Sequence, residues 1–502
     1  MMSILTGAVL AMGAVFAPLS GLSVSEVCAQ WGGNGLSFTT ENGVATVTDC
    51  DSSAVNVEIP SQLGGCPVVN IGESAFMYCN ALTSVKIPDS VTYIGDSAFY
   101  GCGKLSSISL PANVTTLESG AFAYCGSLTQ LVIPNRVNYI GNYTFYNCTQ
   151  LSSISIPDSV TVIGEGAFKN TAAYNATSNG VVMIDGWAVA CIGMYDTNIT
   201  LNSGTRGISN NAFKDCTSLC NLTVADTVRY IGASAFEGCI ALNTVKLSSR
   251  LTRIDEYTFY GCPLLSSITI PDSVTGIGNG AFNGTALYKL SSDVTYIDGW
   301  AIDCSTSYSG RLELSGSVRG IADSAFNNCS GITYASIPAS VKSIGNSGFS
   351  GCTSLAEVVI ADGATQIGKY AFYKCEKLKK LTIPSSVKKI DSEALSGCTG
   401  VTIYGYSGTA AESFARSQSF SFVSLGQGNP GENNGLLGDT DGDGAVSVYD
   451  AFSVLRYDAE VISLNSEQLE LSDVNGDGAV NSADALLILE FSAELIVSFP
   501  RS

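Results

Sequence analysis

A 23-residue repeat constrains the fold of this chain more than any other feature of its sequence. The phenylalanine of an Ala-Phe pair returns at that spacing in three runs, and the last slot holds a leucine: Phe76, Phe99, Phe122, Phe145, Phe168; Phe213, Phe236, Phe259, Phe282; Phe326, Phe349, Phe372 and Leu395. Self-similarity at a fixed period of this length is typical of stacked structural repeats. The sequence therefore predicts an array of thirteen coils.

Each repeat carries the parts of one coil. Around Ile108 the alternation of apolar and polar residues predicts a short strand, and Pro111 ends it because proline cannot donate a ladder hydrogen bond. Val91 and Ile94 begin a second extended piece, and the segment from Phe99 to Cys102 is expected to form a short helical turn. One coil cannot bury its apolar side, so successive coils must stack with their strands in parallel. We expect a β-rich, right-handed solenoid with a parallel sheet and short helical turns.

Two insertions interrupt the period, and both carry the same motif. Ile184-Asp185-Gly186-Trp187-Ala188 recurs as Ile297-Asp298-Gly299-Trp300-Ala301. An Asp-Gly pair between apolar runs favours a tight hairpin. We therefore expect hairpin-bearing coils near residues 180–200 and 290–310.

The array resembles the 23-residue leucine-rich repeat of BspA-like bacterial surface and secreted proteins. The repeated Ile-Pro-Asp-Ser-Val (87–91, 156–160 and 270–274 in the sequence), the Ala-Phe pair and the Cys-x-x-Leu step carry the resemblance. It implies an N-terminal cap at 30–60, a leucine-rich-repeat solenoid at 61–400 and a C-terminal cap at 401–426. A polar linker, rich in Gly and Asn, follows at 427–436.

Composition excludes several classes of function. The chain has 502 residues, 24 Lys plus Arg, 44 Asp plus Glu, no histidine, and a formal net charge of −20. The acidic balance argues against nucleic acid as a partner, because phosphate binding needs clustered basic residues. Without histidine there is no Ser-His-Asp or Cys-His catalytic group.

The N-terminus predicts an export signal over residues 1–29. An apolar run at 4–19 is too short for a comfortable membrane span, and Val27-Cys28-Ala29 offers a cleavage site before Gln30. The alternative is a buried N-terminal helix. We expect no membrane span in the mature chain and an extracellular location.

Cysteine and tyrosine also recur at fixed positions. Eleven of the 17 cysteines stand three residues after the repeat phenylalanine or its leucine, where buried thiols are favoured over a disulfide ladder. For Cys50 and Cys66, outside that slot, a disulfide and two free thiols remain open. Tyrosines directly after the phenylalanine, such as Tyr100 and Tyr146, pack between coils or stack on sugars or partner proteins.

The acidic C-terminal end holds two calcium-loop patterns 34 residues apart. A loop of this kind places oxygen ligands at positions 1, 3, 5, 7, 9 and 12 and a glycine at position 6. Gly444 and Gly478 stand at position 6. The predicted ligands of two Ca²⁺ ions are Asp439, Asp441, Asp443, Ala445, Ser447 and Asp450, and then Asp473, Asn475, Asp477, Ala479, Asn481 and Asp484, with the alanines acting through their carbonyl groups.

A duplicated loop and helix of this kind resembles a type I dockerin over residues 437–497. One apolar helix is expected after each loop, at 451–459 and 485–495, with no matching helix before it. The resemblance implies a small all-α module that binds a cohesin domain of a scaffoldin. Its contact positions would be Val448, Tyr449, Leu455, Arg456 and Glu460, then Ser482, Ala483, Leu489, Glu490 and Glu494.

The sequence thus favours a secreted, non-enzymatic binding protein of a cellulosome or cell surface. The dockerin would bind a cohesin, and the solenoid would present a surface to an unknown protein or glycan. Two alternatives stay open. One is a polysaccharide-degrading enzyme or accessory component of a cellulosome, and the other is a structural spacer without a ligand of its own.

Overall fold

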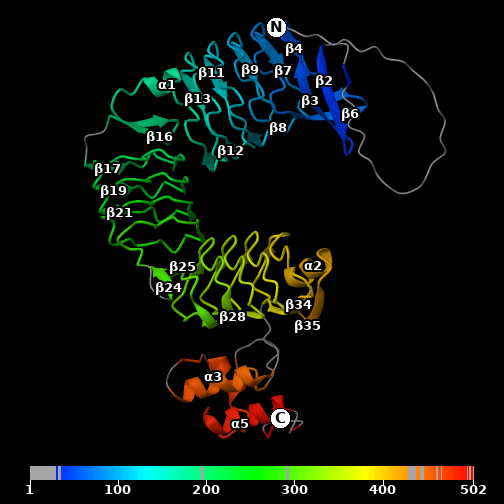
Figure 1. Ribbon diagram of the computed structural model, residues 1–502, viewed down its shortest axis with the longest axis vertical. Coiled ribbons are helices and arrows are strands. Elements are labelled where there is room, and N and C mark those ends of the chain that lie inside the picture. Colours follow the sequence, from blue (N-terminus) through cyan, green and yellow to red (C-terminus); the bar gives the residue numbers. More distant parts are fainter. Residues whose placement is uncertain are drawn as a thin grey trace, which may run out of the picture.

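The computed structural model describes residues 30–31, 35–193, 197–289, 293–427, 437–440, 446–459, 462–464, 466–493, 496 and 499–500. The predicted signal peptide and nearly all of the predicted linker lie outside these ranges. The described chain forms a parallel-sheet solenoid of about sixteen turns and a small helical module (Figure 1). The helices in the described part are all too short or too polar to cross a membrane. The predicted leucine-rich-repeat solenoid with a small all-α module is confirmed.

Two parallel ladders run along the solenoid. The first contains the strand that ends five residues before each repeat phenylalanine or its leucine. The second contains the strand that follows the phenylalanine and ends shortly before the proline in repeats that have one, such as Pro111. We name them the hairpin ladder and the proline ladder. In the hairpin ladder Tyr93 lies opposite Asn70 and Thr116, so one step along the ladder is one repeat of the sequence. The fixed 23-residue period therefore sets the strand register.

The segment around each phenylalanine is a run of turns and not the expected helical turn. The N–H of Phe99 donates to Ala121 O of the next coil at 2.7 Å, while the N–H of Cys102 donates to Phe99 O at 3.2 Å. Ser97 and Gly101 have φ of 53° and 74°. These left-handed residues on either side of Phe99 send alternate N–H groups to the neighbouring coil, where a helix would keep them within the segment.

Stacked phenylalanines and cysteines fill the interior. The repeat Phe rings are fully buried, and neighbouring rings lie 4.7–5.7 Å apart with nearly parallel planes. The ladder thiols add polar bonds as well as packing. For example, Cys102 Sγ donates to Phe76 O of the preceding coil at 3.0 Å. No disulfide joins the cysteines of the described residues.

The first block of coils begins with an antiparallel hairpin. Strands β2 (Leu36–Glu41) and β3 (Val44–Cys50) form it, and parallel strands follow. Its hairpin ladder also contains β1 (Gln30–Trp31), β5 (Gln62–Leu63), β6 (Cys66–Ile71), β8 (Tyr93–Ile94), β10 (Thr116–Leu117), β12 (Tyr139–Ile140) and β14 (Val162–Ile163). Its proline ladder contains β4 (Asn56–Glu58), β7 (Ser84–Lys86), β9 (Ser107–Ser109), β11 (Gln130–Val132) and β13 (Ser153–Ser155), and the one-turn helix α1 (Ala172–Asn175) ends the block.

The second block repeats this plan. The hairpin of β15 (Gly180–Ile184) and β16 (Trp187–Ile192) opens it, with Asp185 and Gly186 at the turn. The hairpin ladder continues as β18 (Gly207–Ile208), β20 (Tyr230–Ile231), β22 (Arg253–Ile254) and β23 (Gly276–Ile277), and the proline ladder holds β17 (Asn198–Leu201), β19 (Asn221–Val224) and β21 (Thr244–Lys246).

The third block begins with the second Asp-Gly hairpin, formed by β24 (Val294–Ile297) and β25 (Trp300–Cys304). The hairpin ladder continues as β27 (Gly320–Ile321), β29 (Ser343–Ile344), β31 (Gln366–Ile367) and β33 (Lys389–Ile390). The proline ladder holds β26 (Ser309–Glu313), β28 (Gly331–Ile337), β30 (Glu357–Ile360), β32 (Lys380–Thr382), β34 (Thr402–Ser407) and β35 (Ser421–Gln427), and helix α2 (Ala410–Ser417) packs near its end.

The two tryptophans of the insertions explain why two positions of the next coils are glycine. Trp187 lies opposite Gly207 in the parallel register, and Trp300 lies opposite Gly320. A Cβ atom at either glycine would come within 2.6 Å of the indole ring. The repeat therefore tolerates only glycine where the tryptophan of the preceding hairpin crosses the ladder.

Polar contacts join the blocks into one curved array (Figure 1). At the first junction Asp185 Oδ2 accepts from Ile156 N at 2.6 Å, and Arg206 donates to Ile156 O at 2.9 Å. At the second junction Asp298 accepts from Ile270 N at 2.7 Å, and Arg319 donates to Ile270 O at 3.0 Å. Each hairpin is thus bonded to the last coil of the block before it.

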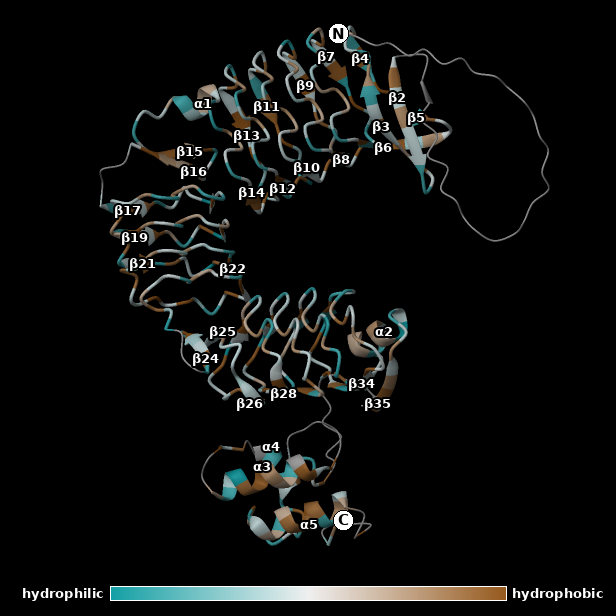
Figure 2. Cartoon of the chain, viewed as in Figure 1, coloured by the Kyte–Doolittle hydropathy of each residue, from teal (hydrophilic) through white to brown (hydrophobic). Residues whose placement is uncertain are grey.

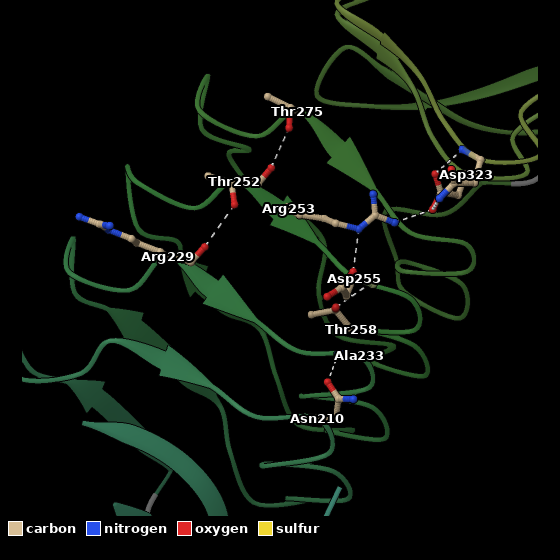
Figure 3. Close-up of polar contacts among 10 residues, drawn as sticks. Asn210, Arg229, Ala233, Thr252, Arg253, Asp255, Thr258, Thr275 and Asp323 are labelled. Carbon is tan, nitrogen blue, oxygen red and sulfur yellow. Dashed lines mark hydrogen bonds and ion pairs between the residues drawn. The ribbon is translucent and has the colours of Figure 1, made fainter. Parts of the chain in front are cut away.

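A buried aspartate adds another bond across the second junction. Arg253 in β22 forms ion pairs with Asp255 in its own coil and with Asp323 in the first full coil of the third block (Figure 3). Asp323 is only 5% exposed. Its carboxylate therefore needs both the guanidinium group and the N–H of Asn346, which donates to it at 2.7 Å.

The C-terminal module contains three helices, and residues of the first and third form its small core together with Val474 and Phe499. The helices are α3 (Val448–Asp458), α4 (Ser466–Ser472) and α5 (Ser482–Ser492). Both α3 and α5 begin three residues before the expected position, and α4 precedes the second loop where no helix was expected. Hydrophobic residues run along α5 (Figure 2). The core residues are Ala451, Val454, Val474, Ala485, Ile488 and Phe499.

Candidate functional site

The second acidic loop lies entirely within the described residues. Asp473, at its first position, accepts hydrogen bonds from the backbone N–H groups of Gly476, Asp477 and Gly478 at 2.8–3.1 Å. Asn475 Oδ1 accepts from Asp477 N at 2.7 Å. Gly478 has φ of 84°, the left-handed conformation that the sharp turn at position 6 requires. The loop is thus wound around its own first carboxylate.

The end of this loop is also the start of α5. Asn481 is the N-cap residue, and its side chain accepts from Ala483 N at 2.8 Å. Asp484 accepts from Asn481 N at 3.1 Å and from Asn475 N at 3.2 Å. Because Asp484 stands in the first turn of the helix, it stabilises the positive end of the helix dipole. This double use of positions 9 and 12 explains why both helices begin earlier than predicted.

The chemistry of the second loop suits a hard cation. Within the described ranges no group of three or more Asp, Glu or Cys side chains is placed so that these side chains alone could hold a metal ion. The loop instead combines the carboxylates of Asp473, Asp477 and Asp484 with amide and carbonyl oxygens, the mixture of ligands that Ca²⁺ takes. The pKa of Asp484 is raised, mainly by burial. Two backbone hydrogen bonds lower this pKa, and the negative charges of Asp473 and Asp477 raise it. A cation here would favour the ionised carboxylate.

The first loop is described only at its two ends. Asp439 and Asp450 are buried, and Asp450 Oδ2 accepts from Ser447 N at 2.8 Å and from Ser447 Oγ at 3.1 Å. This bond reproduces the contact of Asp484 with Asn481 one repeat later. The predicted ligands Asp441, Asp443 and Ala445 lie outside the described residues.

The α3 helix presents an exposed apolar face beside the first loop. The predicted contact residues Val448 and Leu455 are 52% and 40% exposed. Phe452, which the sequence analysis did not name, is 53% exposed and lies between them on the same face. Arg456 is also exposed, with its guanidinium carbon 5.8 Å from the centre of the Phe452 ring. Helical spacing could have identified Phe452, since 448, 452 and 455 share one face.

The α5 helix presents the corresponding face one repeat later. Leu486 and Leu489 are 56% and 37% exposed, and Ser482 and Ala483 are exposed as well, while Glu490 is partly buried. Leu486 was missed for the same reason as Phe452. The predicted contacts Glu460 and Glu494 and the side chain of Tyr449 lie outside the described residues.

A row of tyrosines lies along the turns of the first block. The tyrosine row consists of Tyr78, Tyr100, Tyr124 and Tyr146, whose neighbouring ring centres lie 5.1–5.5 Å apart, together with Tyr143, 5.7 Å from Tyr146. Tyr78, Tyr124 and Tyr143 are each at least 40% exposed, so the rings pack between coils and also face solvent. A hollow of about 520 Å³ is lined by four of these rings and by Asp96, Asn142 and Lys169.

Only part of this row was visible in the sequence. Tyr100 and Tyr146 directly follow the repeat phenylalanine, whereas Tyr78 and Tyr124 follow it by two residues. Tyr78, Tyr124 and Tyr143 occupy the left-handed turn positions, with φ of 55–62°. The alternation of two offsets hides the row from a search at one fixed position.

Family comparisons bear on both parts of the chain. The profile of the BspA type leucine rich repeat region matches in six copies, over residues 67–183, 193–309 and 288–402. This chain belongs to the BspA-type leucine-rich-repeat family. The profile of the dockerin type I domain matches residues 437–490, so the BspA-type array is followed by a type I dockerin, as predicted. No curated protein matches the chain.

Several solved structures are similar to the BspA-type array. A leucine rich cell surface protein from Faecalibacterium prausnitzii is 24% identical over 78% of this chain and 98% of its own, with a TM-score of 0.25. The pneumococcal vaccine antigen PcpA is 15% identical over 80% of this chain and 99% of its own, with a TM-score of 0.28. A leucine-rich repeat protein from Bacteroides capillosus is 32% identical over 26% of this chain and 97% of its own, with a TM-score of 0.23.

The two families define what the parts of this BspA-type chain do in general terms. A type I dockerin implies docking to a cohesin of the cellulosome type, and modules of this kind bind calcium. A leucine-rich-repeat array implies a binding surface, and neither family is catalytic. Both families suggest an extracellular location.

Proposed function

We propose that this chain is an exported binding protein which docks to a cohesin through its calcium-loaded dockerin and presents its solenoid to a separate ligand. The observation that carries the proposal is the joining of the second acidic loop to α5. The residues expected to hold the ion are also those that begin the helix with the exposed contact face. The proposed division of the chain is signal peptide 1–29, caps 30–60 and 401–426, array 61–400, linker 427–436 and dockerin 437–497.

The proposed calcium ligands act on the loop and the helix together. When bound, Ca²⁺ would neutralise the clustered carboxylates and hold six to eight oxygens around one point. In the second loop Asp473, Asn475, Asp477, Ala479, Asn481 and Asp484 would supply them, and the same positions of the first loop would hold a second ion. Asp484 then fixes the first turn of α5, and Asp450 the first turn of α3. Ion binding therefore supports the presentation of both helix faces.

The two faces favour unequal docking. Val448, Phe452 and Leu455 make the α3 face, which also carries the Arg456 side chain. The α5 face has Ser482, Leu486 and Leu489 at the equivalent positions, and so lacks the aromatic ring. Aromatic and arginine side chains are enriched among residues that dominate binding energies. We propose that the cohesin binds mainly to α3.

Docking is tested with the full chain on a panel of immobilised cohesins, in calcium and in chelator. We expect capture by at least one cohesin in calcium and none after chelation. Leu455→Asp should weaken this capture at least tenfold, because it places a charge in the contact. Leu489→Asp should weaken it less, and Ile240→Asp, at a 53% exposed site on the solenoid, should not change it. Capture that persists in chelator, or is insensitive to Leu455→Asp, would overturn the proposal.

For the solenoid we propose a glycan ligand at the tyrosine row. Exposed rings at spacings close to 5 Å, flanked by Asp96, Asn142 and Lys169, combine flat apolar surfaces with hydrogen-bonding groups. The measurement is binding of the full chain to plant cell-wall polysaccharides on an array. Tyr124→Ala should abolish binding, whereas Tyr260→Ala, at an exposed tyrosine in the second block, should not.

The same assay separates the alternatives. Release of reducing sugar from the bound polysaccharide would favour an enzyme. Binding of extracellular proteins and no glycan would favour a protein ligand. Binding of neither would favour a spacer. The last two results contradict the glycan proposal, the first contradicts a role limited to binding, and all three leave the docking proposal untouched.

A further inference from the structure

Three cysteines outside the ladder occupy equivalent places in the three blocks. Cys50 ends β3, Cys304 ends β25, and Cys191 lies next to the end of β16. Each belongs to the second strand of the hairpin that opens a block, and each pairs in register with an apolar residue of the first strand. The Asn-Gly or Asp-Gly turn of each hairpin has both residues at positive φ. The N-terminal hairpin and the two insertions are thus three copies of one element.

Each of these cysteines lies against the first ladder cysteine of its block. The thiols of Cys50 and Cys79, of Cys191 and Cys216, and of Cys304 and Cys329 form side-chain hydrogen bonds with each other. Cys329 Sγ is also 3.6 Å from Cys304 O, and Cys79 Sγ is 4.0 Å from Cys50 O. Cys191 and Cys216 line the same small hollow of about 160 Å³.

The first ladder cysteine differs from those that follow it because a hairpin, not a coil, precedes it. In later coils the thiol donates to the carbonyl oxygen of the preceding repeat phenylalanine at 3.0–3.2 Å, as Cys239 does to Phe213. In the first coil of each block, the segment one repeat earlier belongs to the hairpin and holds no repeat phenylalanine. The hairpin places a cysteine there instead. At all three block openings, a hairpin cysteine thus replaces the phenylalanine as the neighbour of the ladder thiol. Packing of small apolar residues alone does not explain this threefold repetition.

We propose that these three pairs, Cys50 with Cys79, Cys191 with Cys216 and Cys304 with Cys329, are disulfide sites that fasten each opening hairpin to the first coil behind it. Formation of each bond removes two protons and two electrons from the two thiols. The oxidant is a disulfide, supplied by a thiol–disulfide oxidoreductase of an export compartment or by a small disulfide.

The exchange has two steps, and its atoms balance. One thiolate of the pair attacks a sulfur of the oxidant, and a mixed disulfide forms as one thiolate leaves. The second cysteine of the pair, as thiolate, then attacks the protein sulfur of that mixed disulfide, and the oxidant leaves as a dithiol or as two thiols. The hydrogen bond from Cys50 lowers the pKa of Cys79, and Cys191 and Cys304 do the same for Cys216 and Cys329.

The test uses the full chain, unfolded in reductant and refolded in a buffer of oxidised and reduced glutathione. Remaining thiols are alkylated, and peptides from a non-reducing digest are identified by mass spectrometry. We expect three linked peptides, for 50–79, 191–216 and 304–329. The ladder cysteines of later coils, together with Cys66 and Cys220, should be alkylated. A Cys50–Cys66 link, links between later ladder cysteines, or no links would overturn the proposal.

Matched variants distinguish the loss of one disulfide from misfolding of the chain. Cys191→Ser should remove the 191–216 link, leave Cys216 alkylated and preserve the other two links, which report that the chain has folded. Cys220→Ser, only four residues from Cys216, should preserve all three. Loss of all links in Cys191→Ser but not in Cys220→Ser would contradict three independent sites. None of these outcomes depends on cohesin or glycan binding.

Discussion

Single residues decide how one coil of this BspA-type array connects to the next. The left-handed residues two places before and after each phenylalanine turn alternate N–H groups toward the neighbouring coil. Serine, glycine, asparagine, aspartate, tyrosine and lysine share these positions. The thiol of each later ladder cysteine uses a second lone pair of the phenylalanine carbonyl of the coil behind it. These positions of the repeat therefore form hydrogen bonds both within their own coil and with a neighbouring coil.

The phenylalanine stack makes a large packing contribution that a single substitution can remove. Phe236 is fully buried, with ring centres 5.0 Å from Phe213 and 5.6 Å from Phe259. Phe236→Ala should lower the free energy of unfolding by about 3–5 kcal/mol, because it leaves a cavity between two coils. Urea denaturation measures the loss. Ile240→Ala, at an exposed site nearby, serves as control, and an equal loss in both variants would contradict the stacking argument.

The buried ladder thiols predict a loss of stability in alkali. Burial raises the pKa of Cys102, Cys148 and Cys352 from 9.0 to about 12. Above pH 9 the unfolded chain releases these protons while the folded chain retains them, so the free energy of unfolding falls as pH rises from 9 to 12. Each such thiol contributes about 1.4 kcal/mol per pH unit in that window.

Urea midpoints in reductant at pH 7, 9 and 10 test this dependence. The midpoint should be steady below pH 9 and fall steeply above it. Replacing Cys102 by alanine should reduce the slope above pH 9, whatever it does to the midpoint at pH 7. A slope unchanged by that replacement would show that other groups cause the alkaline loss.

At the scale of elements, the hairpins and the helix starts show what the sequence could predict. Strand spacing, coil register and the Asp-Gly turns followed from local patterns, because period and turn chemistry act within a few residues. The prediction of a helical turn at the phenylalanine was wrong. The run of turns found there depends on hydrogen bonds to carbonyl groups 22 residues away, which a local pattern does not reveal. The helix starts were displaced because Asp450 and Asp484 are at once the last residues of the two loop patterns and residues of the first helical turns. The equivalence of the N-terminal hairpin to the two insertions was hidden, because Val44 stands where they have tryptophan.

Two aspartates at the second hairpin allow the stability contribution of a buried hydrogen bond to be compared with that of an exposed ion pair. Asp298 accepts from the N–H of Ile270, a residue that is 2% exposed, and also pairs with Arg319. Asp298→Ala should cost about 1–3 kcal/mol, because that N–H loses its acceptor. Asp272→Ala removes only a fully exposed partner of the same arginine, and should cost less than about 1 kcal/mol. Equal urea midpoints for the two variants would refute this.

At the scale of the whole molecule, the solenoid and the dockerin have separate hydrophobic cores. The array buries two large clusters that together run from Leu36 to Ala415, whereas the hydrophobic cluster in the described part of the module has six buried residues. A solenoid gains stability by adding interfaces between coils, so its core grows with every repeat. The dockerin has no such reserve, and we expect its small core to need bound calcium for stability. The two parts should therefore respond differently to the removal of calcium.

Calorimetry of the full chain should resolve this as two transitions, of which only one depends on calcium. Calcium at 100 times its dissociation constant should stabilise the module by about 2.7 kcal/mol for each site, and chelator should abolish that gain. Asp473→Ala should remove part of it, because this carboxylate organises three amides of the loop, and Asp226→Ala on the solenoid should remove none. If chelation instead lowered the solenoid transition, the array would hold a cation of its own. A single transition that moved as one with calcium would mean that the two cores unfold together, and the dockerin would then be a structural part of the array and not an independent anchor.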